Sequence, residues 1–331
     1  MANILEINEL KQHFVVGKTK PIIGSKIKVL ANDGISVSIA EGETLGLVGE
    51  SGCGKSTFGR TITKLYKPTA GTILFDGQNI TEMKGEKLRK LRKDFQIIFQ
   101  DPYSSLDPKM TVGAIIGEAL VEHKMFKSNS AELENYIIEI MEKCGLAGYM
   151  INRYPHQFSG GQRQRIGIAR AIALKPKFIV CDEAVSALDV SIQSQIINLL
   201  VDLRKEFNFT YLFISHDLNV VRHISDRVGV MYLGKIVELA DSKDIYNNTL
   251  HPYSKMLLEA VPKIDGGKAD DHEVILGDIP SNSSVNPIKG CKFHTRCPIA
   301  EKKCSLEVPL LEEKEKNHFV ACHLVCKNEE L

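Results

Sequence analysis

Apolar and polar positions follow two different periods along this chain. Four short runs with the alternation of strands lie within residues 1–48, namely ILEINEL, HFVV, GISVSIA and ETLGLVG. From Lys55 to about Tyr66 the period becomes helical. Two further strands are expected in GTILFDGQNI, which contains a turn at Asp76 and Gly77, and in FQIIFQ. The N-terminal part of the chain is therefore predicted to be strands interrupted by one helix.

The middle of the chain, residues 111–174, is predicted to be mostly helical. Its periodic segments are TVGAIIGEALVEH, SAELENYIIEIMEKC and GQRQRIGIARAIAL. Strands and helices then alternate, in the order KFIVCDE, VSIQSQIINLLVDLRKEF, TYLFISH, LNVVRHI, RVGVMYLG and KIVELA. This alternation predicts a parallel α/β core. We interpret the helical block as an insertion into that core.

Composition and charge narrow the functional classes. Residues 265–290 are rich in Gly, Asp, Ser, Asn and Pro, and are expected to link the core to a cysteine-rich segment, 291–331. The net charge of +1 provides no field that would attract nucleic acid or an anionic membrane. We expect no secretory signal in MANILEINEL, and no apolar run approaches the roughly 18 residues that span a bilayer. A role at a membrane would therefore depend on partner subunits.

A phosphate-binding loop is predicted in GESGCGKST, which matches G-x-x-x-x-G-K-[ST] between an apolar strand and a helix. Its glycines would turn backbone N–H groups toward phosphates at a helix N-terminus. Lys55 would contact the β- and γ-phosphates, and Ser56 would bind Mg²⁺. The alternative is a glycine-rich turn with a surface lysine. The predicted nucleotide-binding residues here are Gly49, Glu50, Ser51, Gly52, Cys53, Gly54, Lys55, Ser56 and Thr57.

Two carboxylates follow the predicted buried strand in FIVCDE, at the end where open α/β sheets bind ligands. Asp182 is expected to hold Mg²⁺ through water. Glu183 is expected to polarise the attacking water in hydrolysis. A helix-capping or surface acid is the alternative for Glu183.

The stretch FSGGQRQR, residues 158–165, resembles the signature motif of ABC-transporter ATPases. The resemblance implies a P-loop ABC ATPase fold over 1–264, of class α/β, with a RecA-like parallel sheet and an antiparallel β subdomain. It also implies a helical subdomain inserted at about 102–175. Two ATP molecules would be sandwiched in a head-to-tail dimer. The residues expected to reach ATP on the opposite subunit are Ser159, Gly160, Gly161 and Gln162.

Other motifs occur in the order of that family. Gln100 resembles the Q-loop glutamine, implied to contact Mg²⁺ together with Ser56 and Asp182. His216 resembles the switch histidine at the γ-phosphate, and a pair in SALD, Ser186 and Asp189, resembles the D-loop. Phe14 resembles the residue that stacks on adenine, although a core Phe is nearly as plausible. Phe158 and Ala184 stand where the family more commonly has Leu and Pro.

Narrower matches indicate one branch of the family. GESGCGKST, FQDPYSSLDP, HPYSKMLLEAVP and the tail CKFHTRCP…HFVACH together resemble ATPase subunits of dipeptide/oligopeptide permeases. The resemblance implies a peripheral ATPase at the cytoplasmic face of the membrane. Its partners would be a second, related ABC ATPase, two transmembrane permease subunits and an extracellular or periplasmic substrate-binding protein.

Alternative functions stay open at this point. The same branch includes nickel and glutathione importers. A soluble ABC-type ATPase acting on nucleic acid or ribosomes draws support from KLRKLRKDF, although a solvated helix face explains that basic run more simply, and we expect no nucleic-acid partner.

The tail carries four cysteines spaced C-x5-C-x6-C-x17-C. From the residues alone these thiols could hold Zn²⁺ or an iron–sulfur cluster, or be reduced side chains in a small core. Resemblance to permease ATPases favours a [4Fe–4S] cluster, with Zn²⁺ as the alternative. The expected ligands are Cys291, Cys297, Cys304 and Cys322. The spare candidates are His294, His318, His323 and Cys326.

Overall fold

The computed structural model describes residues 2–18, 26–260, 280, 282–285 and 287–325. Most of the predicted linker and Cys326 lie outside these residues. The chain forms two compact units. Unit 1 comprises Met1–Leu5, Ile39–Glu43 and Phe75–Ile214, and unit 2 comprises Glu6–Ser38, Thr44–Leu74 and Ser215–Leu331.

Unit 1 contains three parallel strands in the order β8-β7-β6, and a short strand, β5 (Gln78–Asn79). Phe95 of β6 pairs with Phe178 of β7, which in turn pairs with Thr210 of β8. Every residue of β7 and β8 is buried. Strands covered on both faces have continuous apolar sequences, which explains why FIVCD and TYLFI show no alternation. The bounds are β6 (Phe95–Ile98), β7 (Phe178–Asp182) and β8 (Thr210–Ile214).

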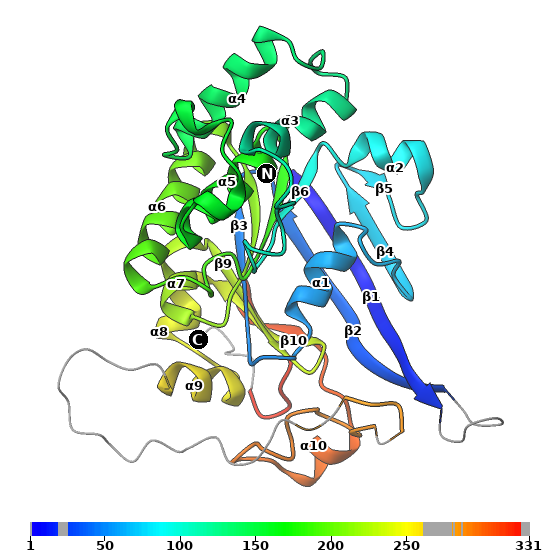
Figure 1. Ribbon diagram of the computed structural model, residues 1–331. Helices are drawn as coiled ribbons and strands as arrows, with labels where there is room; N and C mark the ends of the chain where they lie inside the picture. The colour runs from blue at the N-terminus through cyan, green and yellow to red at the C-terminus, as the bar shows by residue number, and fades with distance from the viewer. Residues whose placement is uncertain (1, 19–25, 261–279, 281, 286, 326–331) are drawn as a thin grey trace. The chain divides into compact units, whose positions relative to one another are not determined.

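The predicted helical block is present in unit 1, and Figure 1 shows α3, α4 and α5 side by side. Polar caps fix where these helices begin. The Thr111 hydroxyl accepts a hydrogen bond from the Ala114 N–H at 3.3 Å, and the Ser130 hydroxyl accepts one from the Leu133 N–H at 3.2 Å. The helices are α2 (Gly85–Leu91), α3 (Val112–Glu122), α4 (Ala131–Lys143), α5 (Gly160–Ile172) and α6 (Val190–Phe207), with 3₁₀ turns η1 (Gly148–Met150) and η2 (Pro155–Gln157).

Unit 2 contains most of a second β-sheet, in which the strands follow the order β2-β1-β4. The sequence predicted two strands in ILEINEL and HFVV, whereas the structure has one strand of 16 residues. Gln12, a polar residue between the two predicted strands, is buried within this single strand. The bounds are β1 (Asn3–Lys18), β2 (Lys26–Ala40) and β4 (Ala70–Phe75).

A second set of strands in unit 2 follows the order β11-β12-β10-β9-β3. β3 and β9 are parallel, β9 and β10 form a hairpin, and the tail hairpin of β11 and β12 pairs antiparallel with β10. The sequence did not predict this tail hairpin because EEKEKNHFV is too polar to resemble a strand. The bounds are β3 (Thr44–Val48), β9 (Arg227–Tyr232), β10 (Lys235–Asp241), β11 (Glu312–Glu315) and β12 (His318–Val320).

Five short helices complete unit 2. They are α1 (Lys55–Ile62), α7 (Leu218–Ile224), α8 (Ser242–Asn247), α9 (Pro252–Glu259) and α10 (Lys302–Leu306). α1 ends four residues before the predicted Tyr66. Within the described ranges, every helix of either unit is too short or too polar to traverse a bilayer.

Candidate functional site

The phosphate-binding loop lies in unit 2 between β3 and α1, as the sequence predicted. Two of its glycines are required by close backbone contacts. A Cβ on Gly49, which has φ 148°, would lie 2.2 Å from the Met231 carbonyl oxygen. A Cβ on Gly54, which has φ 107°, would lie 2.1 Å from the Ala31 carbonyl oxygen. The loop can therefore pass against its neighbours only with glycine at these positions.

Lys55 lies inside the curve of this loop. Its side chain is buried, and its ammonium group donates hydrogen bonds to the Gly49 carbonyl at 2.7 Å and to the Glu50 carbonyl at 3.1 Å. Lys55 is also the first residue of α1, where backbone N–H groups are not used by the helix. A buried cation beside free helix donors is an arrangement that binds phosphate. The alternative of a surface lysine is wrong.

Two residues of unit 1 that were expected to act in hydrolysis are in direct contact. The Gln100 amide nitrogen donates to a Glu183 carboxylate oxygen at 3.0 Å. Glu183 directly follows β7 and has φ 49°, and its N–H donates to the Ile214 carbonyl at 3.0 Å. This left-handed residue turns the chain out of the strand, with the fully buried Asp182 just before it. The end of β7 thus brings a carboxylate and an amide together where hydrolysis was predicted.

The predicted signature motif begins α5. The Ser159 hydroxyl accepts from the Gln162 N–H at 3.3 Å, and the Gln162 side-chain oxygen accepts from the Ser159 N–H at 3.1 Å. This reciprocal pair is a capping box. A Cβ on Gly161 would lie 2.5 Å from Ile192 Cγ2, whereas one on Gly160 would approach nothing closer than 3.7 Å. Packing therefore requires glycine at 161, whereas a Cβ at 160 would make only ordinary van der Waals contact with Leu188.

The two predicted D-loop residues hold local structure in unit 1. The Asp189 carboxylate caps α6 by accepting from the Ile192 N–H at 3.0 Å. The Ser186 hydroxyl donates to the Glu183 carbonyl at 3.0 Å. Ser186 is thereby tied to the chain segment that carries the predicted catalytic carboxylate.

His216 and Phe14 lie in unit 2. His216 is exposed in the turn between β8 and α7, next to Asp217, which caps α7. Phe14 is half-buried and makes an edge-to-face contact with Tyr66, with ring centroids 5.3 Å apart. Phe14 therefore has an aromatic packing partner within unit 2 and stays a predicted adenine-stacking residue.

The prediction of a [4Fe–4S] cluster in the tail is wrong. No group of three or more His, Cys, Asp or Glu side chains in the described part of the chain is placed to hold a metal ion. The four expected ligands, all free thiols, line a cavity of only about 10 Å³ with His251 and Phe293. Burial raises the pKa of Cys291 to about 11 and also raises the pKa of Cys297.

Packing explains why the tail cysteines are close in space. The Cys291 N–H donates to the Cys304 carbonyl at 2.8 Å. Gly290, with φ 67°, permits this approach, because a Cβ there would lie 2.3 Å from the same carbonyl. The spare histidines have other partners: a His294 ring nitrogen lies 2.7 Å from the Cys291 carbonyl, and one of His323 lies 2.9 Å from the Glu307 carbonyl.

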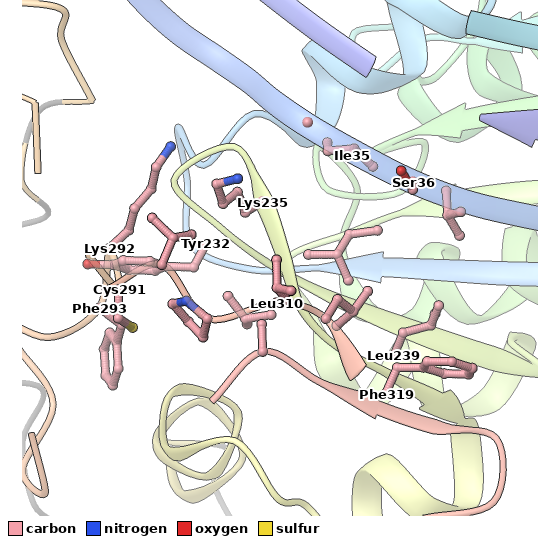
Figure 2. A pocket seen from close by; sticks show the side chains of 18 of the residues that line it. Ile35, Ser36, Tyr232, Lys235, Leu239, Cys291, Lys292, Phe293, Leu310 and Phe319 are labelled. Carbon is pink, nitrogen blue, oxygen red and sulfur yellow. The ribbon is translucent and has the colours of Figure 1, made fainter. Parts of the chain in front are cut away.

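A larger cavity of about 580 Å³ lies in unit 2, where the tail meets strands β2, β9 and β10 (Figure 2). Its walls are mainly apolar, with Ile35 from β2, Leu239 from β10 and Phe319 from the tail. Figure 2 also shows Cys291, Lys292 and Phe293 of the tail close to Tyr232. The tail therefore forms one wall of this cavity and packs on β9 and β10.

Comparisons with known protein families agree with the fold and the loop. The ABC transporter family matches residues 32–186, and the family "Oligopeptide/dipeptide transporter, C-terminal region" matches residues 237–304. The structure is similar to the dimeric, ADP- and phosphate-bound ATP-binding cassette MJ0796, with TM-score 0.64 and 28% identity over 72% of this chain and 98% of that one. It is also similar to cbiO1 from Clostridium perfringens, with TM-score 0.63 and 28% identity, over 75% of this chain and 92% of that one. The fold and the phosphate loop thus define an ABC-type ATPase.

Relatives of similar length narrow that class. The oligopeptide transport ATP-binding protein AppF of Bacillus subtilis is 53% identical over 97% of both chains. The oligopeptide transport ATP-binding protein OppF of Salmonella typhimurium is 49% identical over 96% of this chain and 95% of its own. The chain belongs to the oligopeptide-transport ATP-binding proteins of the ABC transporter family.

Proposed function

We propose that this chain hydrolyses ATP to drive the import of short peptides through partner membrane subunits. The observation that supports this best is the 53% identity to an oligopeptide transport ATP-binding protein over 97% of both chains. The match to the C-terminal region of oligopeptide and dipeptide transporters adds to it, since that region lies outside the ATPase match. Nickel and glutathione remain the competing cargoes.

In the proposed mechanism Glu183 orients and deprotonates the attacking water. Its contact with Gln100 holds the carboxylate in place at the end of β7. Lys55 transfers its ammonium hydrogen bonds from the loop carbonyls to the phosphates of ATP. His216 contacts the γ-phosphate, and Phe14 stacks on the adenine.

The oxygen donors expected at the ATP site suit Mg²⁺. Asp182 presents a fully buried carboxylate at the end of a parallel strand, and hard oxygen donors of this kind suit Mg²⁺. We assign Ser56, Gln100 and Asp182 as the residues that hold it. The bound ion would neutralise charge on the β- and γ-phosphates of ATP.

The helix start at Ser159 acts on the ATP of an opposing subunit in this proposal. A helix start without side chains at Gly160 and Gly161 would let a phosphate approach the first N–H groups of α5. We propose that the opposing subunit is a second, related ABC ATPase, giving a heterodimer with two composite sites. Ser186 and Asp189 lie across the same dimer interface.

The remaining partners are two transmembrane permease subunits and a substrate-binding protein on the outer side of the membrane. The chain is then peripheral, held at the cytoplasmic face by the permease subunits. Residues 1–264 form the ATPase domain, with the helices of about 102–175 as its helical subdomain, and 265–290 link it to 291–331.

Reconstitution tests this function. The complex that co-purifies with the full-length chain is identified by mass spectrometry and inserted into liposomes with its binding protein. We expect ATP turnover to rise when a short peptide is added, and labelled peptide to accumulate inside. Stimulation by nickel or glutathione but not by peptides would replace the peptide assignment. Recovery of ribosomes or nucleic acid without membrane subunits would contradict the transport function.

A further inference from the structure

Glu50 is an acidic residue in the middle of a loop that binds polyanions. Its carbonyl accepts a hydrogen bond from the Lys55 ammonium group at 3.1 Å, so Glu50 belongs to the loop that would surround the phosphates of ATP. A carboxylate at this position repels a triphosphate unless another group neutralises it. The sequence motif tolerates any residue here, and gives no sign of what that group is.

The neutralising group comes from the tail. Two guanidinium nitrogens of Arg296 donate to the two carboxylate oxygens of Glu50 at 2.8 and 2.9 Å. The side chain of Arg296 is 5% exposed and that of Glu50 is 19% exposed. Two parallel hydrogen bonds of this kind fix the direction of a carboxylate as well as its charge. The pair joins residues 246 positions apart in the sequence.

A second contact holds the backbone of the same residue. The Glu50 N–H donates to the Tyr253 hydroxyl of α9 at 3.0 Å. Tyr253 packs against Tyr232 and Phe293, with ring centroids 4.7 and 5.3 Å away. Phe293 lies three residues before Arg296, so the same aromatic cluster anchors both groups that hold Glu50. Tyr232 and Phe293 also contact each other, with ring centroids 5.2 Å apart, and Figure 2 shows both at the wall of the larger cavity.

We propose that Arg296 is a positioning residue for ATP, which neutralises Glu50 and directs its carboxylate away from the phosphates. The tail thereby takes part in nucleotide binding although it contributes no residue to the phosphate motif. This inference rests on ATP binding alone and not on the peptide cargo. A failure of the cargo assignment would leave it intact, and its own failure would leave the cargo assignment intact.

Substitutions of Arg296 and Glu50 distinguish a role of Arg296 in neutralising charge from a role in packing alone. Arg296→Gln leaves an uncompensated carboxylate beside the phosphates, and we expect Mg·ATP to bind on the order of tenfold more weakly. Adding Glu50→Gln removes that carboxylate, so the double variant should recover to within about threefold of the wild-type affinity. Arg296→Lys keeps the charge but loses the paired hydrogen bonds, and should lie between the two.

The experiment is calorimetric titration of the full-length protein with Mg·ATP for the wild type and these three variants. Lys292→Gln is the matched control, because Lys292 is a tail cation that pairs with Asp33 at 3.0 Å and not with the loop. Its affinity should stay within about twofold of wild type.

Two results would overturn the proposal. One is wild-type affinity in a folded Arg296→Gln variant. The other is a double variant that binds as weakly as Arg296→Gln alone, since that result would show that Arg296 only supports the fold of the tail. Thermal unfolding of each variant establishes that it is folded. If Arg296→Gln does not fold, Arg296→Lys keeps the test decisive, because the proposal expects it to bind Mg·ATP more weakly than the wild type, and wild-type affinity in that variant would overturn the proposal.

Discussion

The phosphate-binding loop and the cysteine tail are both short stretches with suggestive residue types, yet only one of them has the chemistry that its residues suggested. In the loop, the backbone makes the site: Gly49 and Gly54 adopt conformations that suit glycine, and Lys55 fills the curve. In the tail, four thiols surround about 10 Å³ and no described group is placed for a metal. A motif whose glycines and order dictate the backbone is thus a stronger predictor than a set of side chains.

The tail nevertheless contributes to the loop through a residue that no motif marks. Arg296 lies next to Cys297 in sequence, and its guanidinium group donates two hydrogen bonds to the Glu50 carboxylate. The informative feature of the tail was therefore an arginine between the cysteines and not the cysteines themselves. The predictions below test each side of this contrast.

The largest effect is expected in unit 1, at the end of β7. Glu183→Gln should leave ATP binding intact and reduce turnover by on the order of 10² to 10⁴, the usual contribution of a general base. Steady-state hydrolysis by the reconstituted complex measures it. Near-normal turnover would show that Glu183 is a structural acid.

A smaller loss of turnover is expected at the start of α5. Ser159→Arg should spare ATP binding by the isolated chain but reduce turnover of the complex by on the order of 10², because a bulky cation would block the helix start that faces the partner's ATP. Lys55→Ala is the matched comparison, which should lose ATP binding by the isolated chain. Equal loss of affinity in both variants would place Ser159 at the ATP of its own chain.

The free energy of unfolding should depend on pH through His251, which lies at the start of α9 beside the tail. This side chain is 1% exposed, and burial lowers its pKa from 6.5 to about 4. The unfolded chain then binds the proton more tightly, so stability is complete above pH 6.5 and decreases as the pH falls from 6.5 toward 4. We expect a loss of about 2 kcal/mol between pH 7.5 and pH 5.

Urea unfolding at the two pH values measures this loss, with His251→Asn as the control. Asparagine can still accept the Tyr253 N–H that the His251 ring accepts at 3.0 Å, but it does not titrate. The pH dependence should decrease in this variant. An unchanged dependence would assign it to groups other than His251.

The smallest effect concerns the thiols as packing groups. Cys304 is 5% exposed, and Cys304→Ala should lower the free energy of unfolding by about 1 kcal/mol through lost packing. Treatment of the wild type with a metal chelator should leave the urea midpoint unchanged. A midpoint that falls with the chelator would contradict the packing interpretation.

Local patterns predicted most of the core and its chemistry. The 18 residues of α6 coincide with the periodic segment VSIQSQIINLLVDLRKEF, and β7 and β8 lie where unbroken apolar runs predicted them. Each of these elements is specified by neighbours in the sequence.

Long-range contacts account for what the sequence could not predict. β12 pairs with β10 as well as with its hairpin partner β11, and its Phe319 lies opposite Leu239, 80 positions earlier. Tyr253 and Arg296 reach Glu50 across 203 and 246 positions. No periodicity within a single segment carries information about such partners.

The pairing of β12 with β10 also bears on the solubility of shortened chains. β10 would otherwise present a row of backbone N–H and C=O groups, and Val237, whose carbonyl now accepts the Ala321 N–H at 2.8 Å, would be among them. Uncovered strand edges of this kind recruit other chains and promote aggregation. A protein that ends before the tail would therefore tend to associate with itself through β10, even with an intact phosphate loop.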